Sequence, residues 1–212
     1  FSQFGAGTLA GAKSYIDRDV LIEPFALMKE AEHLESLGVK NPLKTIKFHP
    51  ECSVTTPYHK IVNRAIQKEN NIGSCGLGVG MTRLTDLKGV SVKGTDSYSE
   101  ILNKLFNIRA ILEDYYYSKY KTPLNFSGCN IYKIAKNLWD SFYFLDFDFA
   151  FFIGFQNTVN QSGCIGRKRN LGNHQGIFVE LSNFSPNTNS SAPQSIIIIG
   201  NICNSCRLKI WK

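Results

Sequence analysis

The sequence lacks an apolar run long enough to cross a membrane as a helix. Its longest apolar stretch, SFYFLDFDFAFFIGF (141–155), is shorter than the roughly 20 residues that a bilayer requires, and it carries Asp146 and Asp148. We therefore exclude a membrane partner and predict that AFFIGF within this stretch forms a buried strand. The two aspartates alternate along the chain, so they are either solvated at a strand edge, as we expect, or a pair of Mg²⁺ ligands.

A disulfide framework is also lacking. We recognise no signal peptide before the cysteines, and their spacing matches no small secreted domain, so we expect reduced thiols and a cytoplasmic location. Cys203 and Cys206 form one CxxC without a second pair or a later histidine, so a zinc site is not expected. The six cysteines are Cys52, Cys75, Cys129, Cys164, Cys203 and Cys206.

Clustered charge is scarce as well. The net charge is +7, but the basic residues are spread out and only Arg167–Arg169 forms a run. An excess of positive charge favours an anionic partner, which is either a phosphorylated metabolite or a nucleic acid. Without a concentrated basic patch, nucleic acid is the less favoured partner, and a basic nucleic-acid-binding protein stays an alternative hypothesis.

The composition is that of a globular protein, with 43% hydrophobic and 19% charged residues. Apolar periodicity predicts helices that alternate with short apolar runs such as SIIIIG (195–200), which are typical of strands covered on both faces. This alternation predicts an α/β fold with a mostly parallel sheet flanked by helices. The predicted helices cover 24–37, 57–70, 97–120 and 131–142, and a short extended segment covers 45–54.

Local signals mark the ends of these helices. Pro24 suits a first helical position, and Gly38 supplies the left-handed residue that ends the same helix. In the second helix, Ile61, Ala65 and Ile66 are predicted to form the apolar face.

The long third helix begins with a capping signal. Ser97 is followed three residues later by Glu100, which predicts a capping box. Near its end, Tyr115–Tyr117 offers three successive tyrosines that could stack on bases. Since only one or two of the three can face one surface of a helix, packing is the favoured interpretation.

A glycine-rich stretch, NNIGSCGLGVGMTRLTD (70–86), follows the second helix. Glycine admits positive φ and lets backbone N–H groups approach an anion. Gly80 is not followed by the lysine of a P-loop, and Met81 stands where a dinucleotide fingerprint needs its third glycine. The pattern alone leaves a flexible turn and an anion-binding loop as alternatives. Its glycines are Gly73, Gly76, Gly78 and Gly80.

Three segments in one order resemble the adenylosuccinate synthetase family. TTPYHKIVNRA followed by IGSCGLGVG resembles the family's Pro-Tyr-His-type helix and Ile-Gly-Thr-Thr-Gly-x-Gly-Ile-Gly loop. Upstream, FGAGTLAGAKSYIDRDVLIEPFALMKEAEHLESLGV is similar to a Gly-x-Gly segment and the helix after it. Downstream, NHQGIFVELSNFSPNTNSS resembles the family's Gln-Gly strand and Thr-Ser-Ser loop. The resemblance indicates a central portion of that domain over 1–191, and a divergent tail of unknown role over 192–212.

The resemblance implies a fold related to the P-loop NTPases, and a function. Family members join IMP and L-aspartate to form adenylosuccinate in purine biosynthesis, using GTP and Mg²⁺, and they act as cytoplasmic homodimers. In place of the family's Thr-Thr pair this sequence has Ser74 and Cys75, and a thiol is the weaker donor. Lys88 is considered as a phosphate contact. The IMP-binding positions implied by the resemblance are Ser74, Cys75, Gln175, Thr188 and Asn189, with the backbone of Gly73, Gly76 and Gly78.

Other motifs of the family have no counterpart in this sequence. The GTP-binding loop with its catalytic aspartate, and the Gly-His motif with its catalytic histidine, are not found, so we assign no catalytic and no metal-binding residue. We expect a fold that is incomplete at both ends and a chain that has no synthetase activity by itself. A non-catalytic purine-nucleotide-binding module is the alternative. His59 and His174 are expected to be structural, since neither has a catalytic partner in view.

Overall fold

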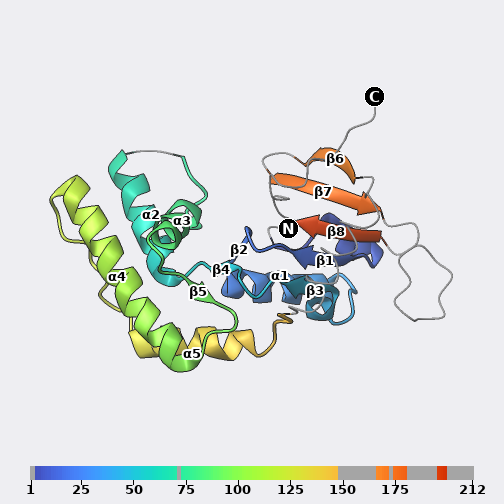
Figure 1. Ribbon diagram of the computed structural model, residues 1–212, viewed down its shortest axis with the longest axis horizontal. Coiled ribbons are helices and arrows are strands. Elements are labelled where there is room, and N and C mark those ends of the chain that lie inside the picture. Colours follow the sequence, from blue (N-terminus) through green and yellow to red (C-terminus); the bar gives the residue numbers. More distant parts are fainter. Residues whose placement is uncertain (1–2, 71–72, 148–165, 172–173, 181–194, 200–212) are drawn as a thin grey trace. The chain divides into compact units, whose positions relative to one another are not determined.

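The computed structural model describes residues 3–70, 73–147, 166–171, 174–180 and 195–199 (Figure 1). The chain divides into two compact units. Unit 1 comprises Phe1–Val20, Leu27–Pro50 and Asp146–Lys212, and unit 2 comprises Leu21–Ala26 and Glu51–Leu145.

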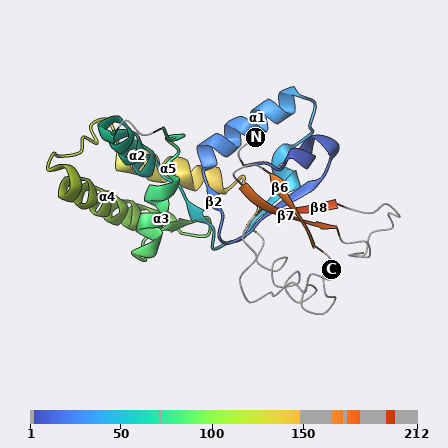
Figure 2. The ribbon, with the colours of Figure 1, turned by 90° about the horizontal axis from the view of Figure 1, so that it is seen from above.

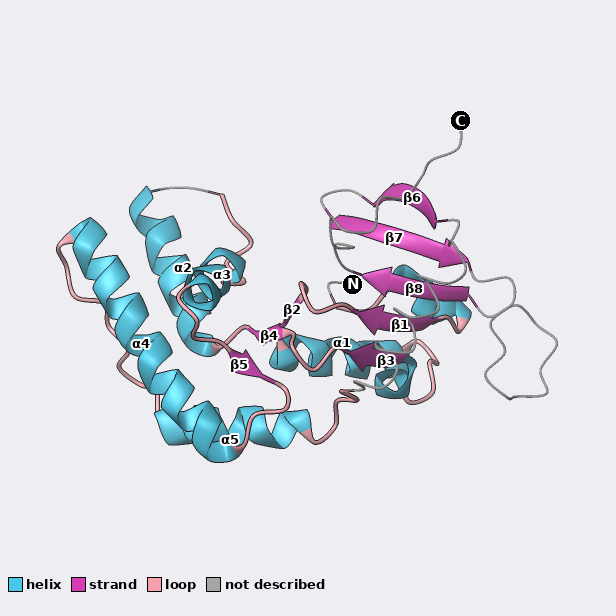
Figure 3. Cartoon of the chain, in the orientation of Figure 1, coloured by secondary structure: helices cyan, strands magenta, loops and turns pink. Residues whose placement is uncertain are grey.

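Unit 1 is built on a five-stranded sheet (Figure 3). Its strands, in spatial order, are β3 (Ile46–Phe48), β1 (Lys13–Ile16), β8 (Ser195–Ile199), β7 (His174–Glu180) and β6 (Gly166–Leu171). The pairs β1–β3 and β1–β8 are parallel, whereas β7–β8 and β6–β7 are antiparallel. The α/β class is therefore confirmed. Strands β3, β1 and β8 run parallel to one another, and β7 and β6 form antiparallel pairs toward the other edge.

The strand predicted from SIIIIG is β8, and it is a central strand. Tyr15 of β1 pairs with Ile198 on one side, and Ile177 of β7 pairs with Ile198 on the other. Two 3₁₀ helices, η1 (Ala6–Ala10) and η2 (Pro42–Thr45), precede β1 and β3 in the chain. Part of the segment after residue 191 thus belongs to this sheet.

Helix α1 (Pro24–Ser36) begins at the predicted proline. The Oε2 atom of Glu23 accepts a hydrogen bond from the backbone N–H of Ala26 at 2.8 Å, which caps the first turn. Gly38 has φ 92° and ends the helix in the left-handed conformation. The helix buries Leu27, Ala31 and Leu34, while Leu37 at its end is exposed.

Unit 2 combines a three-stranded sheet with four helices (Figures 1 and 2). Its strands are β2 (Leu21–Ile22), β4 (Ser53–Val54) and β5 (Val92–Lys93), and its helices are α2 (Pro57–Asn70), α3 (Val79–Leu87), α4 (Tyr98–Tyr120) and α5 (Ile131–Phe142). Strands β2 and β4 pair in parallel, and β5 pairs antiparallel to β4. Helix α2 packs against both α3 and α4, and α4 packs against α5.

The capping box of α4 is confirmed. The backbone N–H of Glu100 donates to Ser97 Oγ at 3.3 Å, and the backbone N–H of Ser97 donates to Glu100 Oε2 at 2.7 Å. Of the three tyrosines near the end of α4, Tyr116 is buried and Tyr117 is 55% exposed. The tyrosines therefore pack in part, as predicted. The buried residues of α4 are Ile101, Leu105, Ile108, Leu112 and Tyr116.

The predicted apolar face of α2 is wrong. Ile61, Ala65 and Ile66 are only half-buried, and the fully buried side chains of this helix are Tyr58, His59 and Val62. The cause is that the buried face contains a histidine and a tyrosine, which an apolar count does not include. Tyr58 packs edge-on against the Phe126 ring, with 5.0 Å between the ring centroids.

Several sequence predictions fall on residues that the structure does not describe. The AFFIGF strand, Asp148 and the CxxC pair lie outside the described residues. Asp146 forms an ion pair with Lys47 at 3.4 Å. Within the described residues, no three His, Cys, Asp or Glu side chains gather in a way that could hold a metal ion. No helix in the described part of the chain is long and apolar enough to cross a membrane.

Candidate functional site

The glycine loop connects α2 to α3 and has the backbone geometry of a tight approach. Gly76 has φ 64° and Gly78 has φ 83°, a region that side-chain-bearing residues rarely adopt. A Cβ atom added at Gly78 would lie 2.8 Å from the carbonyl carbon of His59 and 2.9 Å from the backbone nitrogen of Lys60. Only glycine therefore allows the loop to lie directly on the backbone of α2.

The loop ends at the N-terminus of α3. Gly78 is the N-cap residue, and it offers no side chain to accept a hydrogen bond from the first turn. The backbone N–H groups of Val79, Gly80 and Met81 make no hydrogen bond to any residue that the structure describes. Such N–H groups lie at the positive end of a helix dipole, where an anion is stabilised.

Two amide side chains of α2 hold the loop in place. Asn63 Oδ1 accepts a hydrogen bond from the N–H of Gly78 at 2.9 Å, and its Nδ2 donates to Ser74 Oγ at 3.2 Å. Gln67 Nε2 donates to the carbonyl oxygen of Ser74 at 2.9 Å. Ser74 Oγ also accepts from the N–H of Gly76 at 3.2 Å. The Ser74 hydroxyl therefore organises the loop while its side chain stays exposed.

Cys75, the residue after Ser74, differs from the other described cysteines in its exposure. Cys75 is a free, exposed cysteine, whereas Cys52 is buried and Cys129 is half-buried. The thiol of Cys75 is thus accessible within the glycine loop.

His59 lies beneath the loop and is fully buried. The backbone N–H of Thr56 donates to His59 Nδ1 at 2.9 Å, so Nδ1 must be the unprotonated nitrogen of the ring. Nε2 then carries the proton and donates to Thr85 Oγ1 at 3.0 Å. Burial lowers the pKa of His59 to about 3, so the ring is neutral at physiological pH. The expected structural role of His59 is confirmed by these contacts.

Threonine hydroxyls extend this hydrogen-bond network into α3. Thr85 Oγ1 donates to the carbonyl oxygen of Thr82 at 3.0 Å, and Thr82 Oγ1 donates to the carbonyl oxygen of Gly78 at 3.0 Å. Thr55 Oγ1 lies 3.0 Å from Thr82 Oγ1. All of these groups are buried and satisfied, so they fix the position of α3 and of the last loop glycine relative to α2.

Part of the predicted IMP site lies within unit 2. Ser74, Cys75 and the loop glycines lie together in unit 2. Lys88 is exposed at the C-terminal cap of α3, ten residues after Gly78, so it lies roughly 15 Å along the helix from that glycine. Arg83, the other basic residue near the loop in sequence, forms an ion pair with Asp86 at 3.4 Å.

The IMP-binding positions predicted downstream of the loop either belong to unit 1 or lie outside the described residues. Gln175 is in β7, where its partner in the ladder is Asn170 of β6, and His174 pairs with Leu171. Thr188 and Asn189 are outside the described residues.

Sequence reasoning missed Asn63 and Gln67. They are four residues apart on α2, so they lie on one face of the helix. A pair of amides at this spacing, just before a glycine-rich loop, is the signal that could have identified them.

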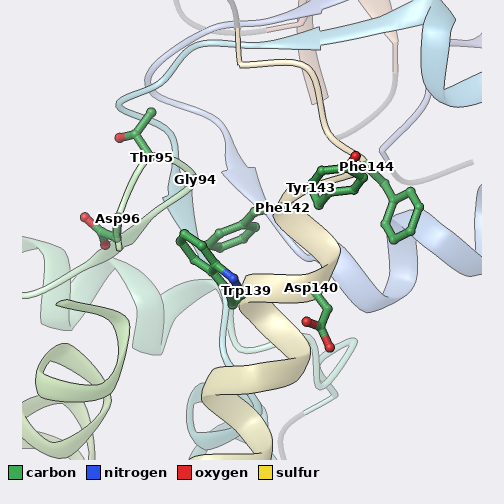
Figure 4. A pocket seen from close by; sticks show the side chains of 8 residues that line it. All are labelled: Gly94, Thr95, Asp96, Trp139, Asp140, Phe142, Tyr143 and Phe144. Atoms are coloured by element: carbon green, nitrogen blue, oxygen red, sulfur yellow. The ribbon is translucent and has the colours of Figure 1, made fainter. Parts of the chain in front are cut away.

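A separate cavity of about 640 Å³ lies at the end of α5 (Figure 4). Its two carboxylates are neutralised, since Asp96 pairs with Lys104 at 2.7 Å and Asp140 pairs with Lys136 at 2.7 Å. The remaining surface is largely aromatic, so the cavity does not suit an anion. It is lined by Gly94, Thr95, Asp96, Trp139, Asp140, Phe142, Tyr143 and Phe144.

Comparison with known proteins identifies the family of this chain. The family model of adenylosuccinate synthetase matches residues 1–141. The chain is 38% identical over 64 residues to an adenylosuccinate synthetase of Clostridium novyi, a match that covers 29% of this chain and 15% of that protein. It is 33% identical over 73 residues to an adenylosuccinate synthetase of Neisseria gonorrhoeae, covering 33% of this chain and 17% of that protein. These matches span less than a fifth of each relative's length. Because the family model covers well over half of the 212 residues, the chain belongs to the adenylosuccinate synthetase family.

Proposed function

We propose that this chain binds the 5′-phosphate of IMP at the glycine loop, as part of the reaction that joins IMP and L-aspartate at the expense of GTP. The observation that carries the proposal is the N-terminus of α3. Three backbone N–H groups there are without partners among the described residues, and Gly76 and Gly78 form the adjoining loop with positive φ. A phosphate dianion fits such a site because the helix dipole and the N–H groups act on it together.

Within the loop, each residue has a separate task. Ser74 supplies a hydroxyl that donates to Gln67 Oε1 at 3.4 Å and can turn this O–H toward a phosphate oxygen. Asn63 holds Gly78 through its N–H group, so the end of the loop stays in place when a ligand enters. Gln175 in β7, with Thr188 and Asn189, is proposed to contact the same nucleotide, in keeping with the family.

GTP and Mg²⁺ serve the family reaction by activating the 6-oxygen of IMP through phosphorylation. The described residues contain no acidic cluster that fits Mg²⁺, and the sequence contains no P-loop lysine motif. We therefore derive no step through either group, and we propose that the 212-residue polypeptide binds IMP without turning it over. A homodimer and a cytoplasmic location are further proposals that follow from the family.

A non-catalytic purine-nucleotide-binding module is the second candidate function, and the same loop geometry supports it. The two candidates differ in turnover. Formation of adenylosuccinate from IMP, GTP and aspartate by the purified chain would establish an active synthetase and overturn the proposed inactivity. Binding of IMP without turnover is the expected result.

Calorimetric titration with IMP tests the proposal. Inosine is the matched control, because it lacks only the phosphate that the loop is proposed to bind. We expect IMP to bind measurably and inosine to bind more weakly. Equal affinity for the two ligands, or no binding of IMP, would show that the loop is not a phosphate site. In the latter case, binding to DNA that weakens steeply with salt would favour a nucleic-acid partner instead.

A further inference from the structure

Arg64 extends from α2 along the glycine loop. A Cβ atom added at Gly76 would lie 3.4 Å from Arg64 Cγ and 3.5 Å from Arg64 Nε. The Arg64 side chain therefore packs against the loop at Gly76, in the space that a side chain at that position would occupy. The residue is exposed, so its guanidinium is available to a ligand from solvent.

The charge of Arg64 is not used within the described structure. Its guanidinium forms no hydrogen bond and no ion pair with any described residue. The side chains that hydrogen-bond the loop, Asn63 and Gln67, are both neutral amides. Helix α2 carries two further cations: Lys60 pairs with Glu23 at 3.1 Å, and Lys68 is exposed. Arg64 is the cation whose side chain lies within 3.5 Å of the Cβ position at Gly76.

We propose that Arg64 is the cationic residue that binds the nucleotide phosphate at the glycine loop. This inference rests on the proposed function of the loop. A guanidinium binds phosphate through two parallel N–H groups, which a lysine cannot do. Arg64 lies at the loop itself, whereas Lys88 lies at the far end of α3 and Arg83 is already paired with Asp86.

The proposed contact of Arg64 would offset the weaker donor at Cys75. A thiol is a weak hydrogen-bond donor, so the loop has one strong side-chain hydroxyl, Ser74. A charge-assisted contact from α2 is stronger than the hydroxyl contact that a second threonine would provide. The guanidinium approaches from the α2 side of the loop, while the free N–H groups of Val79 to Met81 come from α3.

Titration of Arg64 variants with IMP and inosine tests the proposal. Arg64→Gln should weaken IMP binding by roughly tenfold or more, because a hydrogen bond to a charged group is lost, and should leave inosine binding unchanged. Arg64→Lys keeps the charge but loses the paired N–H groups, so its affinity for IMP should be intermediate. Lys133→Gln removes the same charge from an exposed position of α5 and should bind IMP like the unaltered chain.

The outcomes separate this inference from the function on which it rests. If the unaltered chain binds IMP and Arg64→Gln binds it equally well, the role of Arg64 is overturned and the loop remains a phosphate site. If the unaltered chain binds no IMP, both fail. If Arg64→Gln weakens IMP and inosine alike, the residue acts on the shape of the loop and the proposed phosphate contact is wrong. Far-UV circular dichroism of each variant shows that the fold is retained.

Discussion

Acidification should destabilise this protein through His59. In the folded state its pKa is lowered to about 3 by burial, whereas an unfolded histidine has a pKa of about 6.5. The unfolded chain therefore binds a proton at a pH where the folded chain does not, and stability falls as the pH drops below about 6.5. The contribution is fully present above that pH.

The size of the effect follows from the same two values. Each pH unit between the unfolded and folded pKa removes about 1.4 kcal/mol of unfolding free energy, so the decrease from pH 7.5 to 5.0 is about 2 kcal/mol. Protonation would also place an N–H of the ring against the N–H of Thr56, which now donates to Nδ1. The two effects have the same sign.

Urea unfolding at several pH values measures this contribution, and two variants isolate it. His59→Gln removes the titrating group, so it should be less stable at pH 7.5 but should lose about 2 kcal/mol less than the unaltered chain on acidification. Val62→Ala, a buried truncation one turn further along α2, is the control for lowered stability. Its pH dependence should run parallel to that of the unaltered chain. Equal acid losses in His59→Gln and the unaltered chain would refute the reasoning.

Two further predictions concern the glycine loop. Gly78→Ala forces a side chain into a left-handed residue and within 2.8 Å of the His59 backbone, so it should lower the unfolding free energy by about 2 kcal/mol or more. Gly73→Ala meets no atom of the described residues within 4 Å and should cost far less by urea unfolding. Cys75 is exposed, so iodoacetamide should modify it quickly and saturating IMP should slow the reaction, as read by mass spectrometry. Buried Cys52 should react little in either condition, and modification of Cys75 unaffected by IMP would argue against the proposed site.

The helix ends could be predicted because the groups that stop a helix are local. Pro24 opens α1, and Gly38 ends its last turn in the left-handed conformation. Ser97 and Glu100 satisfy each other's backbone N–H groups at the start of α4 without help from another element. These capping interactions involve residues within about four or five positions of one another, so the sequence alone predicts them.

The interior of unit 2 could not be predicted in the same way. The buried face of α2 carries His59, whose burial is tolerated only because Thr56 and Thr85 complete its hydrogen bonds. Thr85 lies 26 residues further along the chain. A polar residue in a core depends on partners from other elements, and apolar periodicity does not include them.

The sequence by itself indicated the family, the helices α1, α2, α4 and α5, and the glycine loop with Ser74 and Cys75, whereas helix α3 was not predicted. Only the tertiary structure decided which cation reaches that loop. Lys88 and Arg64 are each 12 residues from Gly76 in the chain, but Lys88 lies at the far end of α3, whereas the loop folds back along α2 and places Gly76 against Arg64. The reason is geometric. A helix displaces successive residues by about 1.5 Å along its axis, so its two ends lie far apart, whereas packing brings residues of different segments together.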